Sequence, residues 1–498
     1  MKNHSLLKNT VSSLILQIVT IVCGFILPRM ILQYYGSAVN GLVNSITQFL
    51  SIISFLELGV GAVVQSALYD PLAIKDIEQQ SKIYASAQAF FKRIAQILLI
   101  YVCVLVFLYP YISNQNFGFI YTAVLIIAMS ISSFAQYYFG IVNSLFLTAD
   151  QKGYIQYNIQ TITLIINTIC CVVLMNLGCS IHFVKLITSL IYLARPVYLD
   201  RYVRCHYKID KKVTYLTEPI KQKWNGIAQH VAAIVLDGTD SIVLTVFSDL
   251  KAVSVYSVYY LVVSSIKQMF NAVTNGIQVI LGDLYAKKEF AKLEEVFKFS
   301  EWIIHNATVL IMGCVACLIT PFVLWYTRGI KDTNYNHTVF GYILTLSYAI
   351  YCLRLPYHMM VKASGEYKET QINYVISAIL NLVVSVFMVK KYGLIGVAVG
   401  TLIAMMVQTF GLAVYNSTKI MHISYCGFIK QIVIDIVICL LGMCFCNIFK
   451  IEYSSLWMLI LSSVKVLGIW CIVIIVINVI FYYNNFRILI LKVKNRKL

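Results

Sequence analysis

The sequence predicts an all-α polytopic membrane protein with about fourteen transmembrane helices. Of its 498 residues, 60% are hydrophobic and only 12% are charged, and the mean hydropathy is +0.79. Soluble domains are about 45–50% apolar and about 25% charged, so this composition excludes an ordinary soluble protein. The apolar runs are about 20 residues long or longer, as a membrane-crossing helix requires, and they do not alternate as spanning strands do.

Short polar or glycine-containing connections separate the apolar runs and set the expected helix ends. The first run follows a basic N-terminus, continues past the length of a signal peptide and has no small-residue cleavage pattern. It is therefore expected to be a membrane helix. The predicted helices are 11–35, 40–68, 87–112, 118–148, 154–178, 180–204, 222–248, 252–283, 301–326, 335–362, 370–392, 394–418, 427–449 and 456–485.

The formal net charge of +18 is distributed unevenly between the two sides of the membrane. Loops on the N-terminal side, together with both termini, hold 27 of the 39 Lys and Arg residues, and the opposite loops hold 6. Basic loops remain in the cytoplasm, so both termini are expected to be cytoplasmic. The asymmetry explains the basic character without nucleic acid as a partner. The short outer connections disfavour a membrane enzyme with an external catalytic site.

An internal repeat relates the two halves of the chain at an offset of about 214 residues. Residues 160–181 align with 373–395, so that Asn167 falls on Asn381. Each half has six predicted helices, which makes this a parallel repeat of two pseudo-symmetric lobes around a central cavity. The predicted parts are an N-terminal lobe (1–205), a cytoplasmic linker (206–221), a C-terminal lobe (222–420), and a segment with two extra helices and a basic cytoplasmic tail (421–498).

Several stretches resemble one family of membrane exporters. They include "LPRMILQYYGSAVNGLVN", "ADQKGYIQYNIQT", "YLARPVYL", "LDGTDSIVL" and "LRLPYHMMVKASGEYKETQINYV". These stretches are similar to the multidrug/oligosaccharidyl-lipid/polysaccharide (MOP) exporter superfamily, which includes the MATE transporters, and specifically to its Wzx-type polysaccharide flippases. The resemblance covers the first twelve helices and contains no short catalytic signature.

The resemblance implies two six-helix lobes around a V-shaped cavity in a bacterial plasma membrane protein. It implies translocation of an undecaprenyl-pyrophosphate-linked oligosaccharide from the inner to the outer leaflet by alternating access, without enzymatic activity or a cofactor. The expected partners are the lipid-linked substrate, membrane lipids, a polysaccharide polymerase and glycosyltransferases.

Ionisable side chains inside apolar runs are the candidate functional residues, because such groups usually face a cavity or a partner. Four bases are predicted to line an electropositive cavity for the pyrophosphate, since the planar fork of an arginine binds two oxygens at once. In the alternative interpretation, each base pairs with a nearby acid and only holds helices together. The four bases are Arg29, Arg195, Lys267 and Arg354.

Three acids in the same runs are predicted to act as a gate or in ion coupling: Glu57, Asp237 and Asp240. Glu57 is equally open to a purely structural pairing. No metal site is predicted, because Cys314 and Cys317 have CxxC spacing without a second pair or a histidine cluster.

Two related functions stay open from the sequence. A multidrug exporter should have a net acidic cavity for organic cations, whereas the core bases here outnumber the core acids by five to three. A peptidoglycan-precursor flippase is not separable from the leading interpretation by sequence. The absence of a GxxxxGK[ST] phosphate-binding loop disfavours direct ATP drive.

Overall fold

The computed structural model describes residues 2–113, 117–210, 213–214, 220, 227–449, 451–483 and 485–487, without the side chains of 2–6, 55–59, 62, 227–230, 233–234 and 237. Within these ranges all regular structure is helical, which confirms the predicted fold class. Ten helical segments of the described chain are long and apolar enough to cross a membrane. The protein is therefore a multi-pass membrane protein.

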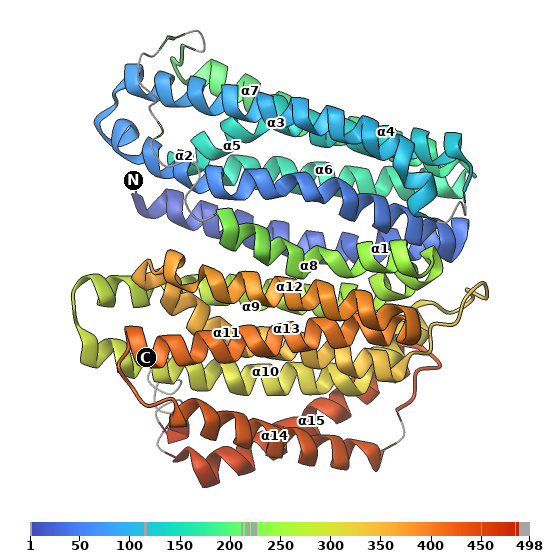
Figure 1. The fold of residues 1–498 in the computed structure, drawn as a ribbon, viewed down its shortest axis with the longest axis vertical. Helices are drawn as coiled ribbons and strands as arrows, with labels where there is room; N and C mark the ends of the chain where they lie inside the picture. The colour runs from blue at the N-terminus through green and yellow to red at the C-terminus, as the bar shows by residue number, and fades with distance from the viewer. Residues whose placement is uncertain are drawn as a thin grey trace. The chain divides into compact units, whose positions relative to one another are not determined.

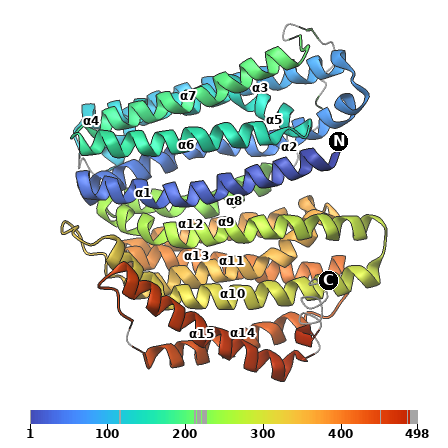
Figure 2. The ribbon, with the colours of Figure 1, turned by 180° about the vertical axis from the view of Figure 1, so that it is seen from behind.

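The first of two compact units contains Met1–Ile234 and Leu244–Ser254. Its long helices lie side by side in both views of the ribbon (Figures 1 and 2). Its helices are α1 (Lys2–Ser51), α2 (Phe55–Ile74), α3 (Ile77–Ile112), α4 (Phe119–Ala135), α5 (Ile141–Ala149), α6 (Gly153–Asn176), α7 (Ile181–His206) and the two ends of α8 (Ile227–Phe247). The middle of α8 belongs to the second unit.

A kink in α1 separates the first two predicted helices. Gly36 has φ 79° and ψ 177°, a conformation that a glycine adopts without steric cost. The part of α1 before Gly36 corresponds to the predicted helix 11–35. The part after it continues through a short 3₁₀ turn, Ile52–Ser54, into α2, and together these segments correspond to the predicted helix 40–68.

The second unit contains Val235–Val243 and Val255–Leu498. In Figure 1, α10 lies between α11 and the pair α14 and α15. Besides the middle of α8, the second unit contains most of α9 (Leu250–Ala286), whose first residues up to Ser254 belong to the first unit. Its other helices are α10 (Phe290–Tyr326), α11 (Thr338–Ser364), α12 (Tyr367–Tyr392), α13 (Leu394–Tyr415), a π-helical turn η3 (Asn416–Ile420), α14 (Cys426–Asn447) and α15 (Leu456–Phe481).

Corresponding helices of the two units start at nearly the same offset as the sequence repeat. Helix α10 starts 213 residues after α3, and α12 starts 214 residues after α6. Helices α3 and α10 have 36 and 37 residues, so at 1.5 Å per residue each is about 55 Å long. Both exceed the roughly 30 Å hydrocarbon core of a bilayer and extend beyond it.

The predicted starts of two helices, 87 and 301, are wrong by about ten residues. The first turns of α3 are polar, and hydrophobicity alone does not reveal them. They are stabilised by local contacts instead: Asp76 caps the helix by accepting a hydrogen bond of 2.9 Å from the backbone N–H of Gln79, and Lys82 pairs with Glu78 at 2.6 Å. The start of α10 has a similar pair, Lys298 with Glu294.

A polar cluster fixes the far end of α7 to the turn between α5 and α6. Lys152 Nζ lies 2.9 Å from Asp150 Oδ2 and donates a hydrogen bond of 2.8 Å to the Tyr207 hydroxyl, which itself donates to Asp150. Burial lowers the pKa of Lys152, but the hydrogen bonds to Tyr207 and Asp150 outweigh burial and hold the pKa above its usual range. Lys152 therefore stays protonated at physiological pH, and its contacts hold the C-terminal end of α7 to this turn.

The two helices beyond the repeat, α14 and α15, pack against α10. The Trp470 ring of α15 is buried against Gly313 of α10 and Gly442 of α14. A Cβ atom at Gly313 would lie 2.4 Å from the Trp470 ring, and one at Gly442 would lie 2.8 Å from it. Both glycines are therefore required by the close approach of the indole. Cys314 and Cys317 pack at the edge of the same apolar cluster.

Replacing Gly313 with alanine is expected to destabilise the packing of α15 on α10. The added methyl overlaps the Trp470 ring, and overpacking of this kind costs about 1–3 kcal/mol. Thermal unfolding of the purified protein in detergent measures the effect as a lower melting temperature. Gly468→Ala on α15 is the matched control, because no atom lies within 4 Å of the added Cβ. Equal melting temperatures for the two variants would contradict this packing.

Candidate functional site

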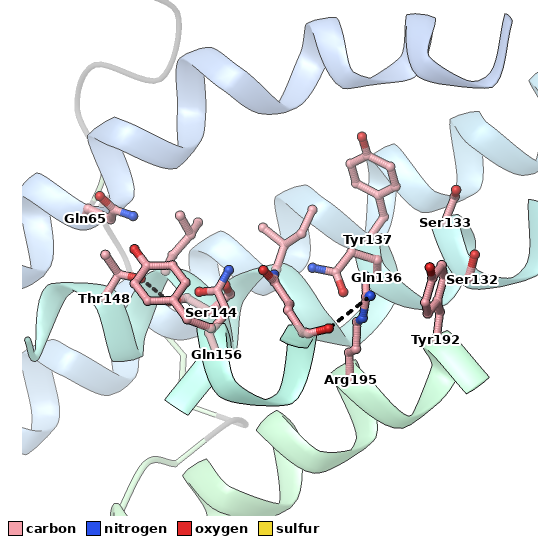
Figure 3. Close-up of a pocket in the computed structure, with 14 residues that line it drawn as sticks. Gln65, Ser132, Ser133, Gln136, Tyr137, Ser144, Thr148, Gln156, Tyr192 and Arg195 are labelled. Atoms are coloured by element: carbon pink, nitrogen blue, oxygen red, sulfur yellow. Dashed lines mark hydrogen bonds between the residues drawn. The ribbon is translucent and has the colours of Figure 1, made fainter. Parts of the chain in front are cut away.

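A polar cavity of about 610 Å³ lies within the first unit. It is enclosed by α2, α4, α5, α6, α7 and the π-helical turn Gln136–Gly140 (η2) that joins α4 to α5. Its described lining contains serines, tyrosines, one threonine, two aliphatic side chains and one arginine. Four glutamines complete it: Gln65, Gln136, Gln156 and Gln160. Figure 3 shows Gln65, Gln136 and Gln156 reaching the cavity from three different segments.

The π-helical turn shapes this cavity. A Cβ atom at Gly140 would lie 2.8 Å from Cβ of Pro196 and 2.7 Å from Oε1 of Gln136, so only glycine allows α7 to pass this closely. The wider turn places Gln136 and Tyr137 in the lining. Turns of this type occur frequently at functional sites in helical proteins.

Arg195 is the basic residue of the cavity lining. Its Nε–H donates a hydrogen bond of 2.6 Å to Oγ1 of Thr163, and the guanidinium carbon lies 3.9 Å from the ring centroid of Tyr192. A longer contact of 3.5 Å reaches the backbone carbonyl of Gln160 (Figure 3). Helix α7 continues for 11 residues beyond Arg195, about 16 Å, so this side chain is well inside the helix. Its partners among the described residues are neutral.

The amide groups of the lining are available to a ligand. The side chains of Gln65, Gln136, Gln156 and Gln160 make no hydrogen bond to another described residue, and the described lining contains no carboxylate. These glutamines were not predicted from the sequence. One signal was present: Gln156 and Gln160 are four residues apart, which places both on one face of α6.

In the second unit, two of the predicted bases meet at one tyrosine. Lys267 of α9 and Arg354 of α11 lie 4.6 Å and 4.5 Å from the centroid of the Tyr351 ring. Both bases are almost fully buried, with exposed fractions of 8% and 6%. A second ring, that of Tyr374 on α12, lies 6.0 Å from Arg354.

Arg354 has no ion pair or hydrogen bond within the described part of the chain, and its Nε atom is buried without a partner. Only aromatic faces contact the charge. The structural alternative for this residue, pairing with a nearby acid, is therefore absent among the described side chains. His358 and Lys362 follow Arg354 at intervals of four residues, so the three share one face of α11. The sequence analysis missed Lys362, although the spacing in "RLPYHMMVK" indicates the row. We call Arg354, His358 and Lys362 on α11 the basic row.

A series of tyrosines extends from the basic row along α9 and α11. The rings of Tyr256 and Tyr260 stack at 5.6 Å, Tyr260 meets Tyr348 at 5.6 Å, and Tyr348 lies 6.3 Å from Tyr351. Two of the three tyrosines in the stretch "SVYSVYYLV" (254–262), Tyr256 and Tyr260, belong to this series. The third, Tyr259, is fully buried and donates a hydrogen bond of 2.8 Å to the backbone carbonyl of Tyr335, so it is a core residue.

Asp240 is buried in the second unit, with 2% of its surface exposed. Its Oδ2 accepts hydrogen bonds from the Tyr256 hydroxyl at 2.8 Å and the Thr401 hydroxyl at 2.7 Å. Asn381 donates to Thr401 at 3.0 Å and accepts from Thr239 at 2.8 Å. A carboxylate, an amide oxygen and hydroxyl oxygens from α8, α9, α12 and α13 thus form one network.

The other predicted site residues are spread over both units. Arg29 lies on α1 of the first unit and is half-buried. Glu57 on α2 and Asp237 on α8 have side chains outside the described residues, as does much of the linker 206–221 and of the basic tail. The structure therefore brings Lys267 and Arg354 together. A shared cavity that also contains Arg29 and Arg195 stays a prediction.

Comparison with solved structures places this architecture in one class: the chain has the fold of the MOP-superfamily transporters. A structure of the lipid II flippase MurJ in an inward closed conformation matches with a TM-score of 0.71 and 16% identity, over 96% of this chain and 99% of that one. An inward-facing multidrug resistance MATE transporter matches with a TM-score of 0.60 and 14% identity, over 81% and 95%. The eukaryotic MATE transporter AtDTX14 gives 0.58 and 11%, over 82% and 95%.

The likeness to MurJ reaches the helices beyond the repeat. A match over 96% of 498 residues leaves about 20 residues uncovered, whereas α14 and α15 contain 22 and 26 residues. At least part of this pair is therefore included. No protein-family model and no curated protein sequence matches the chain.

Proposed function

We propose that this protein is a flippase that moves an undecaprenyl-pyrophosphate-linked oligosaccharide from the inner to the outer leaflet of a bacterial plasma membrane by alternating access. Both termini face the cytoplasm in this proposal. The observation that carries it is the buried pair of bases, Lys267 and Arg354, that both contact the ring of Tyr351. The transporter fold supplies the framework.

The chemistry of this pair favours an anionic ligand. A buried cation is costly unless a counter-charge accompanies it, and Arg354 has none among the described residues. A pyrophosphate supplies that counter-charge and accepts parallel hydrogen bonds from a guanidinium. The row continues through Lys362, so several donors are available along about 12 Å of α11. We assign the pyrophosphate of the lipid carrier to this row, with Arg29 and Arg195 as further contacts along the path.

The same observations disfavour export of organic cations. Neither the basic row nor the described lining of the cavity in the first unit contains a carboxylate. In either unit a cationic drug would meet a guanidinium, that of Arg195 or that of Arg354, whose partners among the described residues are neutral. We therefore propose that this protein shares its fold, but not its substrate, with the MATE transporters named above.

A peptidoglycan-precursor flippase is the second candidate function. The extent of the match to the lipid II flippase MurJ, which includes at least part of the pair α14 and α15, favours it. A lipid-linked precursor of this kind carries the same pyrophosphate, so the basic row serves both substrates. The two candidates differ in the saccharide, and therefore in the pathway that supplies it.

Complementation separates the two candidates. Expression in a strain deleted for its polysaccharide flippase is expected to restore surface polysaccharide, and expression in a strain depleted of its lipid II flippase is expected not to restore growth. Restoration of growth without restoration of surface polysaccharide would show that the transported substrate is the peptidoglycan precursor. Restoration of neither, with the protein present in the membrane, would contradict a flippase. Co-purification with a polymerase or glycosyltransferases tests the proposed partners.

We assign ion coupling to the Asp240 network, with Glu57 and Asp237 as further candidate acids. Hard monovalent and divalent cations prefer oxygen ligands, and this network offers a carboxylate, an amide oxygen and hydroxyl oxygens from four helices. A cation bound here would link α8, α12 and α13. Its binding and release would then bias the conformation of the second unit.

Sodium chloride is expected to stabilise the wild-type protein against thermal unfolding, compared with choline chloride, and Asp240→Asn is expected to remove this difference. Ligand at 100 times its dissociation constant stabilises by about 2.7 kcal/mol. The neutral variant retains the shape but loses the charge that holds a cation. Asp283→Asn, which removes an exposed acid, is the control. An equal sodium effect in Asp240→Asn and the wild type would contradict this assignment.

A further inference from the structure

We infer that the polar cavity in the first unit is a saccharide site, which binds sugar rings of the transported lipid. The inference deepens the proposed function and rests on it for the identity of the cargo. The cavity is lined by residues of the first unit, whereas the basic row belongs to the second unit. Its volume of about 610 Å³ is within the range of about 300–1,000 Å³ that is typical of ligand pockets.

The lining has the chemistry that recognises hydroxyl groups. Each glutamine amide presents two donors and one acceptor oxygen, and the amides of Gln65, Gln136, Gln156 and Gln160 are unpaired within the described residues. They come from α2, η2 and α6, so they surround a ligand from different directions (Figure 3). A polyhydroxylated ring offers alternating donors and acceptors to such a set, whereas an apolar or cationic ligand would leave the amides unsatisfied.

Aromatic groups add the second element of sugar recognition. Tyr157 and Tyr192 line the cavity, and the apolar face of a sugar ring packs on such rings. Arg195 is already held by Thr163 and covers one face of Tyr192. It therefore acts chiefly as an oriented hydrogen-bond donor. In this cavity the oriented guanidinium and the neutral amides donate to the hydroxyl groups of a sugar, while the basic row of the second unit is the main site of the pyrophosphate.

Loss of two amides should weaken saccharide binding without affecting binding of the pyrophosphate. The test variant is the double replacement Gln156→Leu with Gln160→Leu on α6. Asn158→Leu is the matched control, because it removes an amide from the same helix at an exposed position. Gln156→Asn, which keeps the amide but withdraws it by one methylene group, covers the case in which the double variant does not fold.

The first measurement is direct binding. The repeating oligosaccharide of the expression host, released from its lipid by mild acid, is added to the purified full-length protein, and binding is followed by saturation-transfer NMR. The wild type and Asn158→Leu are expected to bind, with the double variant and Gln156→Asn at least about tenfold weaker. Absence of binding by the wild type, or equal binding by all variants, would overturn the saccharide site whether or not the protein transports lipid.

The second measurement is flipping in proteoliposomes of the full lipid-linked oligosaccharide and of the same lipid trimmed to its first sugar. The double variant is expected to lose the preference of the wild type for the longer cargo and to keep transport of the trimmed lipid. If the wild type transports neither lipid, the result would contradict the proposed flippase function but not the saccharide site. An unchanged preference in the double variant would contradict the saccharide site alone.

Discussion

Arg354→Ala is expected to reduce export of the lipid-linked oligosaccharide by at least about tenfold. A hydrogen bond to a charged group contributes about 1.5–3 kcal/mol, and 1.4 kcal/mol corresponds to a factor of ten. The variant removes such bonds together with the positive charge that meets Lys267 at Tyr351. Arg354→Lys should restore only part of the activity, because an ammonium group keeps the charge and loses the planar fork. Surface polysaccharide measures the outcome.

The control for this experiment is Lys368→Ala. Lys368 lies near the start of α12 and is exposed, so its removal changes the net charge by the same amount without touching the row. Protein levels in the membrane fraction must be equal for all variants. Export at the wild-type rate by Arg354→Ala would remove the basis for placing the pyrophosphate at this row.

Asp435→Leu is expected to destabilise the protein by about 3–5 kcal/mol, the usual cost of breaking a buried pair by removing one partner. Asp435 of α14 lies 2.6 Å from Nδ1 of His305 on α10, and the two side chains are 6% and 0% exposed. Its other oxygen accepts a hydrogen bond of 3.1 Å from Gln431. The pair joins one of the two helices beyond the repeat to the helix bundle of the second unit.

A double-mutant cycle separates this pair from simple packing. His305→Leu alone is expected to destabilise as well, whereas the double variant with leucine at both positions should recover most of the stability, because two apolar groups replace a pair without leaving either partner unsatisfied. Thermal unfolding in detergent provides the four values. Additive losses in the double variant would show that the two residues act independently.

The helices could be predicted from the sequence, because each membrane-spanning helix corresponds to a long apolar run. The predicted helix 370–392 and the observed α12, Tyr367–Tyr392, differ by three residues at one end. The kink at Gly36 coincides with a predicted connection. The polar starts of α3 and α10 escaped prediction because capping and ion pairs, rather than hydrophobicity, extend these helices.

The candidate site was predictable only in part. Charges inside apolar runs identified Lys267, Arg354 and Asp240, since burial of such groups is costly and therefore informative. The sequence could not show that Lys267 and Arg354 meet at Tyr351, because the meeting depends on the packing of α9 against α11. Neutral glutamines give no comparable signal. The wider turn at Gly140, which brings Gln136 into the cavity, depends on the contact with Pro196 of another helix.

The proposed function requires that a pyrophosphate-linked saccharide crosses the membrane through this protein. The most direct measurement is reconstitution of the purified protein in liposomes that contain undecaprenyl-pyrophosphate-linked oligosaccharide, with a saccharide-cleaving enzyme outside to report each lipid that reaches the outer leaflet. Wild-type protein is expected to expose the inner-leaflet lipid, and Arg354→Ala protein is expected to do so at least about tenfold more slowly. Protection of the inner-leaflet lipid in wild-type liposomes, equal to that in protein-free liposomes, would contradict it.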